Sequence, residues 1–218
     1  MEKTDSQSEN EAVIRTRSLA SDHLDKRQKI LDEAAALIAS TGFDRARMQD
    51  IAVACDTSKS ALYHYFPRKE DLLYAIIHDH IMGTVEELEV IANESVPPKE
   101  RLQQLVRAMV RRATTRRNEH MVLTNDLKFL SPVQQQEIRL AQAKALAFVV
   151  DLLSEINPRL MRRRRERAAY ALFFYGSMIS TATWYRKDGG MAPVELADRM
   201  TAMLLYGFDG GDHPQGYN

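Results

Sequence analysis

The sequence contains few of the residues on which secreted, fibrous or uniformly charged proteins depend. Its 218 residues include a single cysteine, Cys55, so the chain cannot form an internal disulfide. The 30 Lys and Arg residues are matched by 30 Asp and Glu residues, which excludes a uniformly basic, histone-like protein. No positively charged apolar leader is evident, and 44% of the residues are apolar. We therefore expect a cytoplasmic globular protein of one or two domains that folds without a disulfide, a metal or a cofactor.

Strand signals are nearly absent, whereas apolar residues recur at spacings of three and four from Ile30 almost to the end. This spacing predicts an all-α fold. One stretch, residues 168–185, carries no charge, as a membrane span would. It contains Gly176 and several Ser and Thr residues, and no second span accompanies it. We therefore expect a helix buried between protein surfaces there, and no contact with a membrane.

Breaks in the helical pattern predict where the helices end. Gly42 and Pro67 are stop signals, and Asp56 interrupts the pattern between two short segments. The expected helices cover residues 25–40, 48–54, 59–65, 68–92, 99–114, 118–130, 133–156, 160–187 and 193–208. The expected division of the chain is a flexible tail over 1–24, a three-helix domain over 25–70, a larger helical domain over 71–210 and a second tail over 211–218. The long helix that opens near residue 68 joins the two domains.

Residues 42–69 read GFDRARMQDIAVACDTSKSALYHYFPRK, which is two short helices joined by a tight turn. This spacing is typical of a helix-turn-helix. Because only an exposed helix fits the major groove of DNA, the second helix should present small or polar residues outward. Ser58 is the expected N-cap of that helix. The side chains expected to pack inward are Ile51, Ala52, Leu62 and Phe66, with Tyr65 in the core and Cys55 buried at a helix end.

This segment resembles the TetR family of bacterial transcriptional regulators. The resemblance rests on Gly42-Phe43, Asp50-Ile51-Ala52, Ser58-Lys59, Leu62-Tyr63-His64-Tyr65-Phe66 and Lys69 in register, and it is strong over residues 25–75. Two positions depart from the family pattern. Arg47 stands where a Ser or Thr cap is common, and Asp56 stands where Gly usually makes the turn. Since Asp tolerates the left-handed conformation at a modest cost, we expect the turn to be intact.

The resemblance implies which residues contact DNA. The expected set is Arg47, Gln49, Ser58, Lys59, Ser60, Ala61, Tyr63, His64 and Lys69. Within it, Tyr63, His64 and Lys69 would contact phosphates, as Arg47 could, and Gln49, Lys59, Ser60 and Ala61 would contact bases or the groove. The amide of Gln49 can bond a base edge in a bidentate way. A single Lys or Arg is usually a solvated surface charge, and only the placement of several around one short helix favours phosphate binding.

The resemblance also implies that the larger domain binds a ligand and forms a homodimer through its last two long helices. The expected interface residues are Leu172, Ile179, Leu196, Met200 and Met203. The expected ligand-binding residues are Met109, Met121, Asn125, Phe129, Phe174, Tyr175, Met178 and Trp184. A Met-rich wall adapts to apolar ligands, although such residues are more often simply core. Residues 173–190 resemble the same region of family members that sense acyl-CoA esters, so the expected effector is an acyl-CoA ester, with an unrelated hydrophobic compound or drug as the alternative.

Two further features admit more than one interpretation. The run from Arg162 to Arg167 is either a solvated helix start or a clamp for the phosphates of a CoA group. His78-Asp79-His80 would suit an all-α metal-dependent phosphohydrolase, but neighbouring helical side chains diverge by about 100° and cannot easily share one metal. We expect His80 on the buried stripe of its helix and His78 and Asp79 toward water.

Signatures of nucleotide-loop enzymes, serine hydrolases and zincins are missing. The sequence therefore predicts a regulator rather than an enzyme. Its expected action is that of a homodimeric repressor that leaves a pseudo-palindromic DNA operator when a small apolar effector binds.

Overall fold

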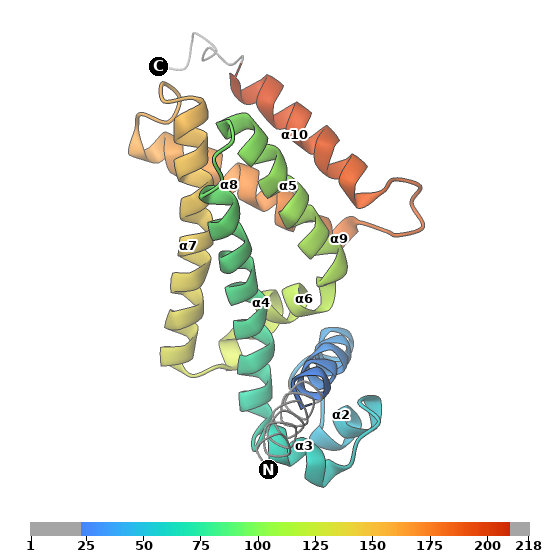
Figure 1. The fold of residues 1–218 in the computed structure, drawn as a ribbon. Helices are drawn as coiled ribbons and strands as arrows, with labels where there is room; N and C mark the ends of the chain where they lie inside the picture. The colour runs from blue at the N-terminus through green and yellow to red at the C-terminus, as the bar shows by residue number, and fades with distance from the viewer. Residues whose placement is uncertain (1–22, 210–218) are drawn as a thin grey trace, which may run out of the picture. The chain divides into compact units, whose positions relative to one another are not determined.

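The computed structural model describes residues 23–209, so nearly all of the two predicted tails lies outside the described residues. No strand occurs within that range, which confirms the all-α prediction (Figure 1). Among the described residues, the first helical stretch covers 23–41. It is followed by α2 (Met48–Ala54), α3 (Lys59–Tyr65), α4 (Lys69–Ala92), α5 (Pro98–Thr115), α6 (Arg117–Asp126), the 3-10 helix η1 (Leu127–Phe129), α7 (Pro132–Ile156), α8 (Arg164–Ile179), α9 (Thr181–Trp184) and α10 (Pro193–Asp209).

The chain divides into two compact units, one ending at Ile76 and the other beginning at Ile77. Helix α4 is continuous across this division, because it starts at Lys69 and ends at Ala92. The domain boundary predicted at residue 70 lies in the first turn of α4, the same helix that contains the observed division.

The first unit packs the apolar side of the 23–41 helix against the short helices α2 and α3 and the start of α4. On the 23–41 helix, Ile30, Ala34 and Ile38 recur at spacings of four residues and are almost completely buried. Gly42, with a φ of +84°, ends this helix in the left-handed conformation that glycine adopts without strain. Cys55 is buried as expected, and its burial raises the pKa of the thiol to about 11.

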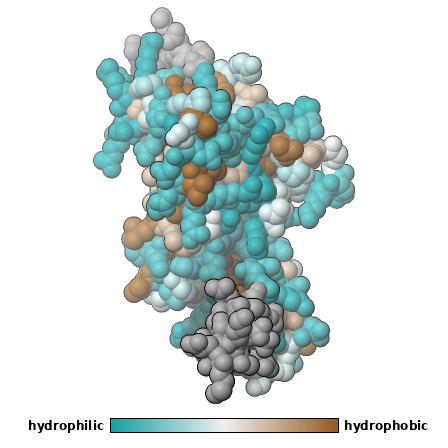
Figure 2. Space-filling view, in the orientation of Figure 1, coloured by the Kyte–Doolittle hydropathy of each residue, from teal (hydrophilic) through white to brown (hydrophobic). Residues whose placement is uncertain are grey.

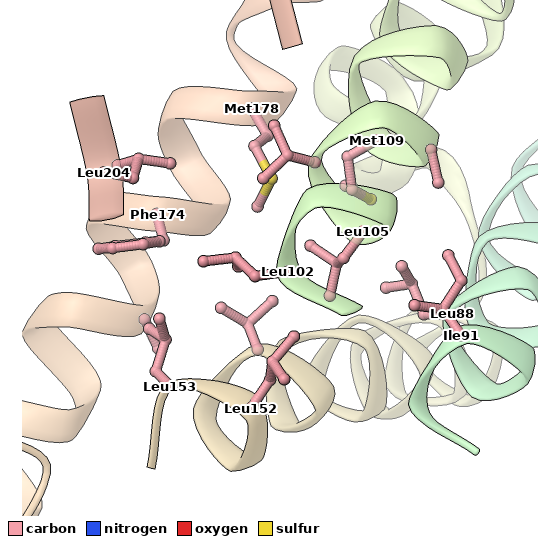
Figure 3. Close-up of a cluster of buried hydrophobic side chains, with 14 of the residues drawn as sticks. Leu88, Ile91, Leu102, Leu105, Met109, Leu152, Leu153, Phe174, Met178 and Leu204 are labelled. Carbon is pink, nitrogen blue, oxygen red and sulfur yellow. The ribbon is translucent and has the colours of Figure 1, made fainter. Parts of the chain in front are cut away.

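The second unit buries one continuous apolar cluster to which α4, α5, α7, α8 and α10 contribute. Figure 3 shows Leu102 and Leu105 of α5 lying among side chains of the surrounding helices. Phe174 of α8 and Leu204 of α10 belong to the same cluster. Full burial of a side chain of this size is worth roughly 1.5–3 kcal/mol, so this cluster is the main source of the second unit's stability.

The single helix predicted over residues 160–187 is wrong, because the structure has two helices there. Helix α8 starts at Arg164 and ends at Ile179, and the short α9 follows after Ser180. The hydroxyls of Ser177, Ser180 and Thr181 each donate to the backbone carbonyl three residues earlier, at 2.6–2.9 Å. Such bonds compete with the helical ladder and weaken it locally, so the density of hydroxyls explains the break.

The helix predicted over residues 118–130 is also shorter than expected. Helix α6 ends at Asp126, and the chain tightens into η1 before α7 begins. Helix α7 starts with a capping box, in which Ser131 accepts from the backbone amide of Gln134 and the Gln134 side chain accepts in return. Within residues 23–209, no helix is long and apolar enough to cross a membrane.

Candidate functional site

The turn between α2 and α3 is closed by backbone hydrogen bonds. The amide of Thr57 donates to the carbonyl of Ala52 at 3.0 Å, and the amide of Asp56 donates to that of Val53 at 3.1 Å. This pair of bonds is a Schellman motif, which requires a left-handed residue just after the helix. Asp56 supplies it with a φ of +50°, as the sequence predicted. The turn is therefore intact although no glycine is present.

Helix α3 begins with the predicted cap and is held by one buried side chain. The hydroxyl of Ser58 accepts from the amide of Ala61 at 3.1 Å. Within the seven residues of α3, only Leu62 is buried, and Phe66 follows it into the core. Ile51 and Ala52 of α2 are buried too, so all four predicted packing residues lie inside.

The other side of α3 faces solvent. The predicted DNA-contacting residues that are exposed are Arg47, Gln49, Ser58, Lys59, Ser60, Tyr63 and His64, and Ala61 is half-buried. The ammonium of Lys59 lies 5.8 Å from the centre of the Tyr63 ring, so a cation and a phenol stand side by side on this surface. Small and polar residues with several hydrogen-bond donors make α3 suitable for the major groove.

Lys69 differs from the other predicted contacts because it is half-buried and already bonded. Its ammonium donates to the backbone carbonyls of Phe43 and Ala46, at 2.8 and 3.0 Å. It thereby fastens the start of α4 to the segment before α2. Tyr65 was expected in the core, but it is only half-buried, with its ring 4.6 Å from that of exposed His23 in the first described helical stretch.

The second unit contains a cavity of about 90 Å³ among α4, α5, α6, α7 and α8, and exposed Thr124 is one of its lining residues. Its lining residues are His80, Ile81, Thr84, Met109, Arg112, Ala113, His120, Leu123, Thr124, Gln142, Tyr175 and Ile179. The wall is therefore part apolar and part polar, which is the usual make-up of a site for a small molecule.

The polar part of the wall centres on His80 and Arg112. One terminal nitrogen of Arg112, Nη2, donates to the backbone carbonyl of His80 at 2.8 Å, and the His80 ring lies 5.9 Å from that of His120. Burial, with Arg112 and His120 nearby, lowers the pKa of His80 to about 3. Burial also lowers the pKa of His120 and raises that of Tyr175. The neutral forms of the two imidazoles are therefore favoured near pH 7.

The cavity contains only two of the predicted ligand-binding residues, Met109 and Tyr175. Phe174 and Met178 are buried in the apolar cluster, and Trp184 is exposed beside a separate hollow. The remaining three, Met121, Asn125 and Phe129, are absent from the cavity wall. Met121 and Asn125 follow His120 and Thr124 by one residue, and a step of about 100° turns them off the face that lines the cavity.

Sequence reasoning missed the polar half of the cavity. His80 was expected on the buried stripe of its helix, where it is found, but no role was drawn from it. Arg112 stands within a basic stretch that looks like solvated surface, yet it belongs to the buried side of α5, between Met109 and Ala113. The available signal was a histidine on an apolar stripe, which needs a buried polar partner.

The predicted interface residues fall into two groups. Leu172 and Met203 are exposed, whereas Ile179, Leu196 and Met200 are half-buried against the apolar cluster. The structure adds exposed apolar residues that the sequence analysis did not name: Phe173 on α8, and Val194 and Tyr206 on α10. In the view of Figure 2, apolar residues stand as separate patches among hydrophilic ones.

Two features remained open in the sequence: the arginine run from Arg162 to Arg167 and the cluster His78-Asp79-His80. Arg162 to Arg165 are exposed, and Arg163 pairs with Glu166 at 3.5 Å. The Nδ1 atom of His78 lies 3.4 Å from Asp79, and Asp79 is exposed while His80 is buried, so the three residues do not converge. Among residues 23–209, no group of three or more His, Cys, Asp or Glu side chains is arranged to hold a metal ion.

Two family models match the chain. Residues 30–76 match the model of bacterial regulatory proteins of the tetR family, and residues 95–208 match that of the tetracyclin repressor-like C-terminal domain. The second match alone covers more than half of the sequence. The first covers the helix-turn-helix described above.

Solved structures and a curated relative agree. A TetR-family transcriptional regulator from Bordetella parapertussis is 33% identical, with a TM-score of 0.76 over 82% of this chain and 93% of that one. AibR, solved in complex with isovaleryl coenzyme A and operator DNA, is 26% identical, with a TM-score of 0.70 over 82% of this chain and 97% of AibR. The transcriptional repressor KstR2 of Mycolicibacterium smegmatis is 21% identical over 84% of this chain and 90% of KstR2. The chain therefore belongs to the TetR family of bacterial transcriptional regulators.

Proposed function

We propose that the protein is a homodimeric repressor that binds a pseudo-palindromic operator and is released by a small effector. The observation that carries this proposal is the outward face of α3. Only Leu62 anchors the helix, so Lys59, Ser60 and Tyr63 are free to meet DNA. Such a regulator would act in the bacterial cytoplasm, where its operator lies.

On DNA, the two copies of α3 in a dimer would enter successive major grooves, about 34–36 Å apart. Lys59, Tyr63 and His64 would contact phosphates and fix the register, while Gln49 at the start of α2 would read a base edge. Lys69 would act mainly by holding α4 against the segment before α2, with one N–H left for a phosphate.

The dimer would form through α8 and α10. Exposed Leu172 and Phe173 on α8, and exposed Met203 and Tyr206 on α10, give these helices apolar surface that a second copy would cover. In a symmetric dimer the same patch serves both subunits, so few residues suffice.

The effector would bind in the cavity of the second unit and shift the protein to a form that does not fit the operator. Helix α4 contributes His80, Ile81 and Thr84 to the cavity wall, and its first residue, Lys69, is bonded to the segment before α2. The same unbroken helix therefore meets both sites. That AibR was solved with isovaleryl coenzyme A supports an acyl-CoA ester as effector, and a different hydrophobic compound is the alternative. Nothing in the arrangement of His78, Asp79 and His80 favours the phosphohydrolase.

Selection from a pool of random-sequence DNA tests the proposal without assuming any operator sequence. Purified protein should enrich a motif with two inverted half-sites about one helical turn apart. Fluorescence anisotropy on that motif should then show binding at least about 1,000-fold tighter than to scrambled DNA, with a steep dependence on salt. Gln49→Ala should reduce the preference for one base position, while Lys59→Met should weaken binding to all sequences.

Enrichment of no motif, or equal binding to selected and scrambled DNA, would refute the proposal. If the Gln49→Ala variant lost specific and scrambled binding in equal measure, only the assigned base contact would be wrong.

A further inference from the structure

The cavity of the second unit is lined by a half-buried arginine, Arg112, whose hydrogen-bonding capacity is only partly used. Arg112 has five N–H donors and no acceptor. Its Nη2 donates to the carbonyl of His80 at 2.8 Å, and its Nη1 lies 3.5 Å from Glu87. Glu87 is also in close contact with Arg111, so this carboxylate is shared between two guanidinium groups. The Nε of Arg112 is buried and has no hydrogen-bond partner within the described part of the chain.

The guanidinium is held in place by its surroundings. At Gly83 on α4, an added Cβ would lie 3.2 Å from Nη2 of Arg112, so the glycine leaves the room that this group occupies. Burial lowers the pKa of Arg112, and Arg116 and Arg111 add to this effect while Glu119 and Glu86 oppose it. An anion beside Arg112 would relieve that unfavourable environment.

Other polar groups converge on the same space. The Nδ1 of His80, a residue 9% exposed, also has no hydrogen-bond partner among residues 23–209. His120, Gln142 and the half-buried Tyr175 line the same cavity. Unsatisfied buried polar atoms are rare in native proteins. His80 and Arg112 each contain one and both line this cavity, which favours a ligand that supplies the missing hydrogen bonds.

The size and the apolar wall limit what the ligand can be. A volume of about 90 Å³ holds roughly three water-sized groups, which is the size of one carboxylate group. Exposed Thr124 is among the lining residues, so the cavity reaches the surface and a longer carbon chain can extend out of it. Ile81, Met109 and Ile179 supply the apolar part of the wall. A buried carboxylate is tolerated only when it is paired and hydrogen-bonded, and the planar fork of an arginine matches its two oxygens.

We infer that this cavity binds a carboxylate on a short carbon chain, with Arg112 as its anchor. The carboxylate comes either from a free short-chain organic acid or from the far end of a dicarboxylic acyl-CoA ester. In both cases Arg112 donates to the carboxylate, Tyr175 and His120 complete its hydrogen bonds, and the carbon chain lies against Ile81 and Met109. This inference rests on the proposed effector-controlled regulator and names the chemistry that the effector presents.

Titration calorimetry of the purified protein without DNA tests the inference. The first arm compares propionate and isovalerate with the neutral amides of the same shape. The second arm compares glutaryl-CoA with valeryl-CoA, which lacks the far carboxylate. In at least one arm, the carboxylate compound should bind about tenfold or more tightly than its neutral partner, because hydrogen bonds to a charged group are the strong ones. Which arm responds identifies the source.

Three variants separate the anchoring role of Arg112 from a general effect of charge. Arg112→Met should abolish binding of the carboxylate compound, whereas Arg111→Met, which removes an exposed guanidinium on the same Glu87, should change it less than about twofold. Arg112→Lys keeps the charge but not the fork, and should bind weakly. Circular dichroism and thermal unfolding verify that each variant folds, and the comparison of acid with amide on the unaltered protein holds even if a variant does not.

Equal binding of acids and neutral analogues, no binding of any of these compounds, or full binding by a folded Arg112→Met variant would overturn the inference. Because this assay contains no DNA, its failure beside intact operator binding would leave the regulator proposal standing. If the protein bound carboxylates but no operator, the regulator proposal would be refuted and the carboxylate site would stand.

Discussion

The ammonium of Lys69 donates to the backbone carbonyl of Phe43 at 2.8 Å and lies 4.2 Å from the centre of the Phe43 ring. The two residues are 26 positions apart, so the contact fastens the beginning of α4 to the segment that leads into α2. Lys69, which was predicted to contact phosphate, therefore also has a structural role: it holds the start of α4 against the segment before the helix-turn-helix.

Lys69→Met and Lys59→Met should therefore have different effects. Removing Lys69 leaves two carbonyls without their charged donor and should lower the free energy of unfolding by about 1.5–3 kcal/mol. Removing the exposed Lys59 should change it by less than about 0.5 kcal/mol, but should reduce the slope of log affinity against log salt by about 0.9 for each phosphate that this lysine neutralises. Urea unfolding and anisotropy on DNA measure the two quantities. If Lys69→Met unfolded at the same urea concentration as the unaltered protein, this structural role of Lys69 would be wrong.

Asp56 should be replaceable by glycine with a gain in stability. Its φ of +50° costs free energy in any residue with a side chain, although less in Asp than in most. Asp56→Gly should stabilise the protein by roughly 0.5–1 kcal/mol after the greater flexibility of the unfolded glycine is counted, and Asp56→Val should destabilise it by about 1–2 kcal/mol. Thermal unfolding measures both. Loss of stability in the glycine variant would mean that the Asp56 carboxylate makes an interaction of its own.

Stability should fall in mild acid because of His80. Its pKa is about 3 in the folded chain against 6.5 for an ordinary histidine, so the unfolded state binds more protons between these values. The free energy of unfolding should be at its full value above pH 6.5. It should decrease as the pH falls toward 3, by up to about 1.4 kcal/mol per unit. His120, whose pKa burial also lowers, adds to the decrease.

Urea unfolding at a series of pH values measures this slope. His80→Gln should flatten it, while His78→Gln, at a partly exposed position two residues earlier, should leave it in place. The same slope in both variants would show that other groups cause the acid sensitivity.

Charge on the exposed apolar faces of α8 and α10 should break the proposed dimer. Phe173 is 65% exposed and Tyr206 is 84% exposed, so Phe173→Glu and Tyr206→Glu should not disturb the folded subunit. Sedimentation should show monomers, and operator affinity should fall with the loss of the second half-site. Val133→Glu on α7, at a position 79% exposed, is the matched control and should remain dimeric. Dimers that persist in both α8 and α10 variants would place the interface elsewhere.

The helix-turn-helix was predictable because its signals are local. Ser58, Gly42 and Asp56 determine caps and turns within a few residues of themselves, and both short helices have the predicted bounds. The cavity was not predictable in the same way. Arg112 and His120 come from separate helices, and what buries them is the packing of five elements rather than the residues beside them in sequence. Likewise, the break at Ser180 depends on which backbone carbonyls the nearby Ser and Thr hydroxyls bond. The spacing of apolar residues in the sequence carries no information about those bonds.

In α3, the residues that hold the helix in the fold are different from those that face solvent, and this separation affects how such a protein can evolve. Its hold on the fold depends on Leu62, the Ser58 cap and a turn closed by backbone bonds, while Lys59, Ser60, Tyr63 and His64 face solvent. Substitutions at those four positions therefore carry little penalty for folding. After gene duplication, substitutions on this exposed face of α3 would give a paralogue that recognises a different operator sequence while keeping the same fold.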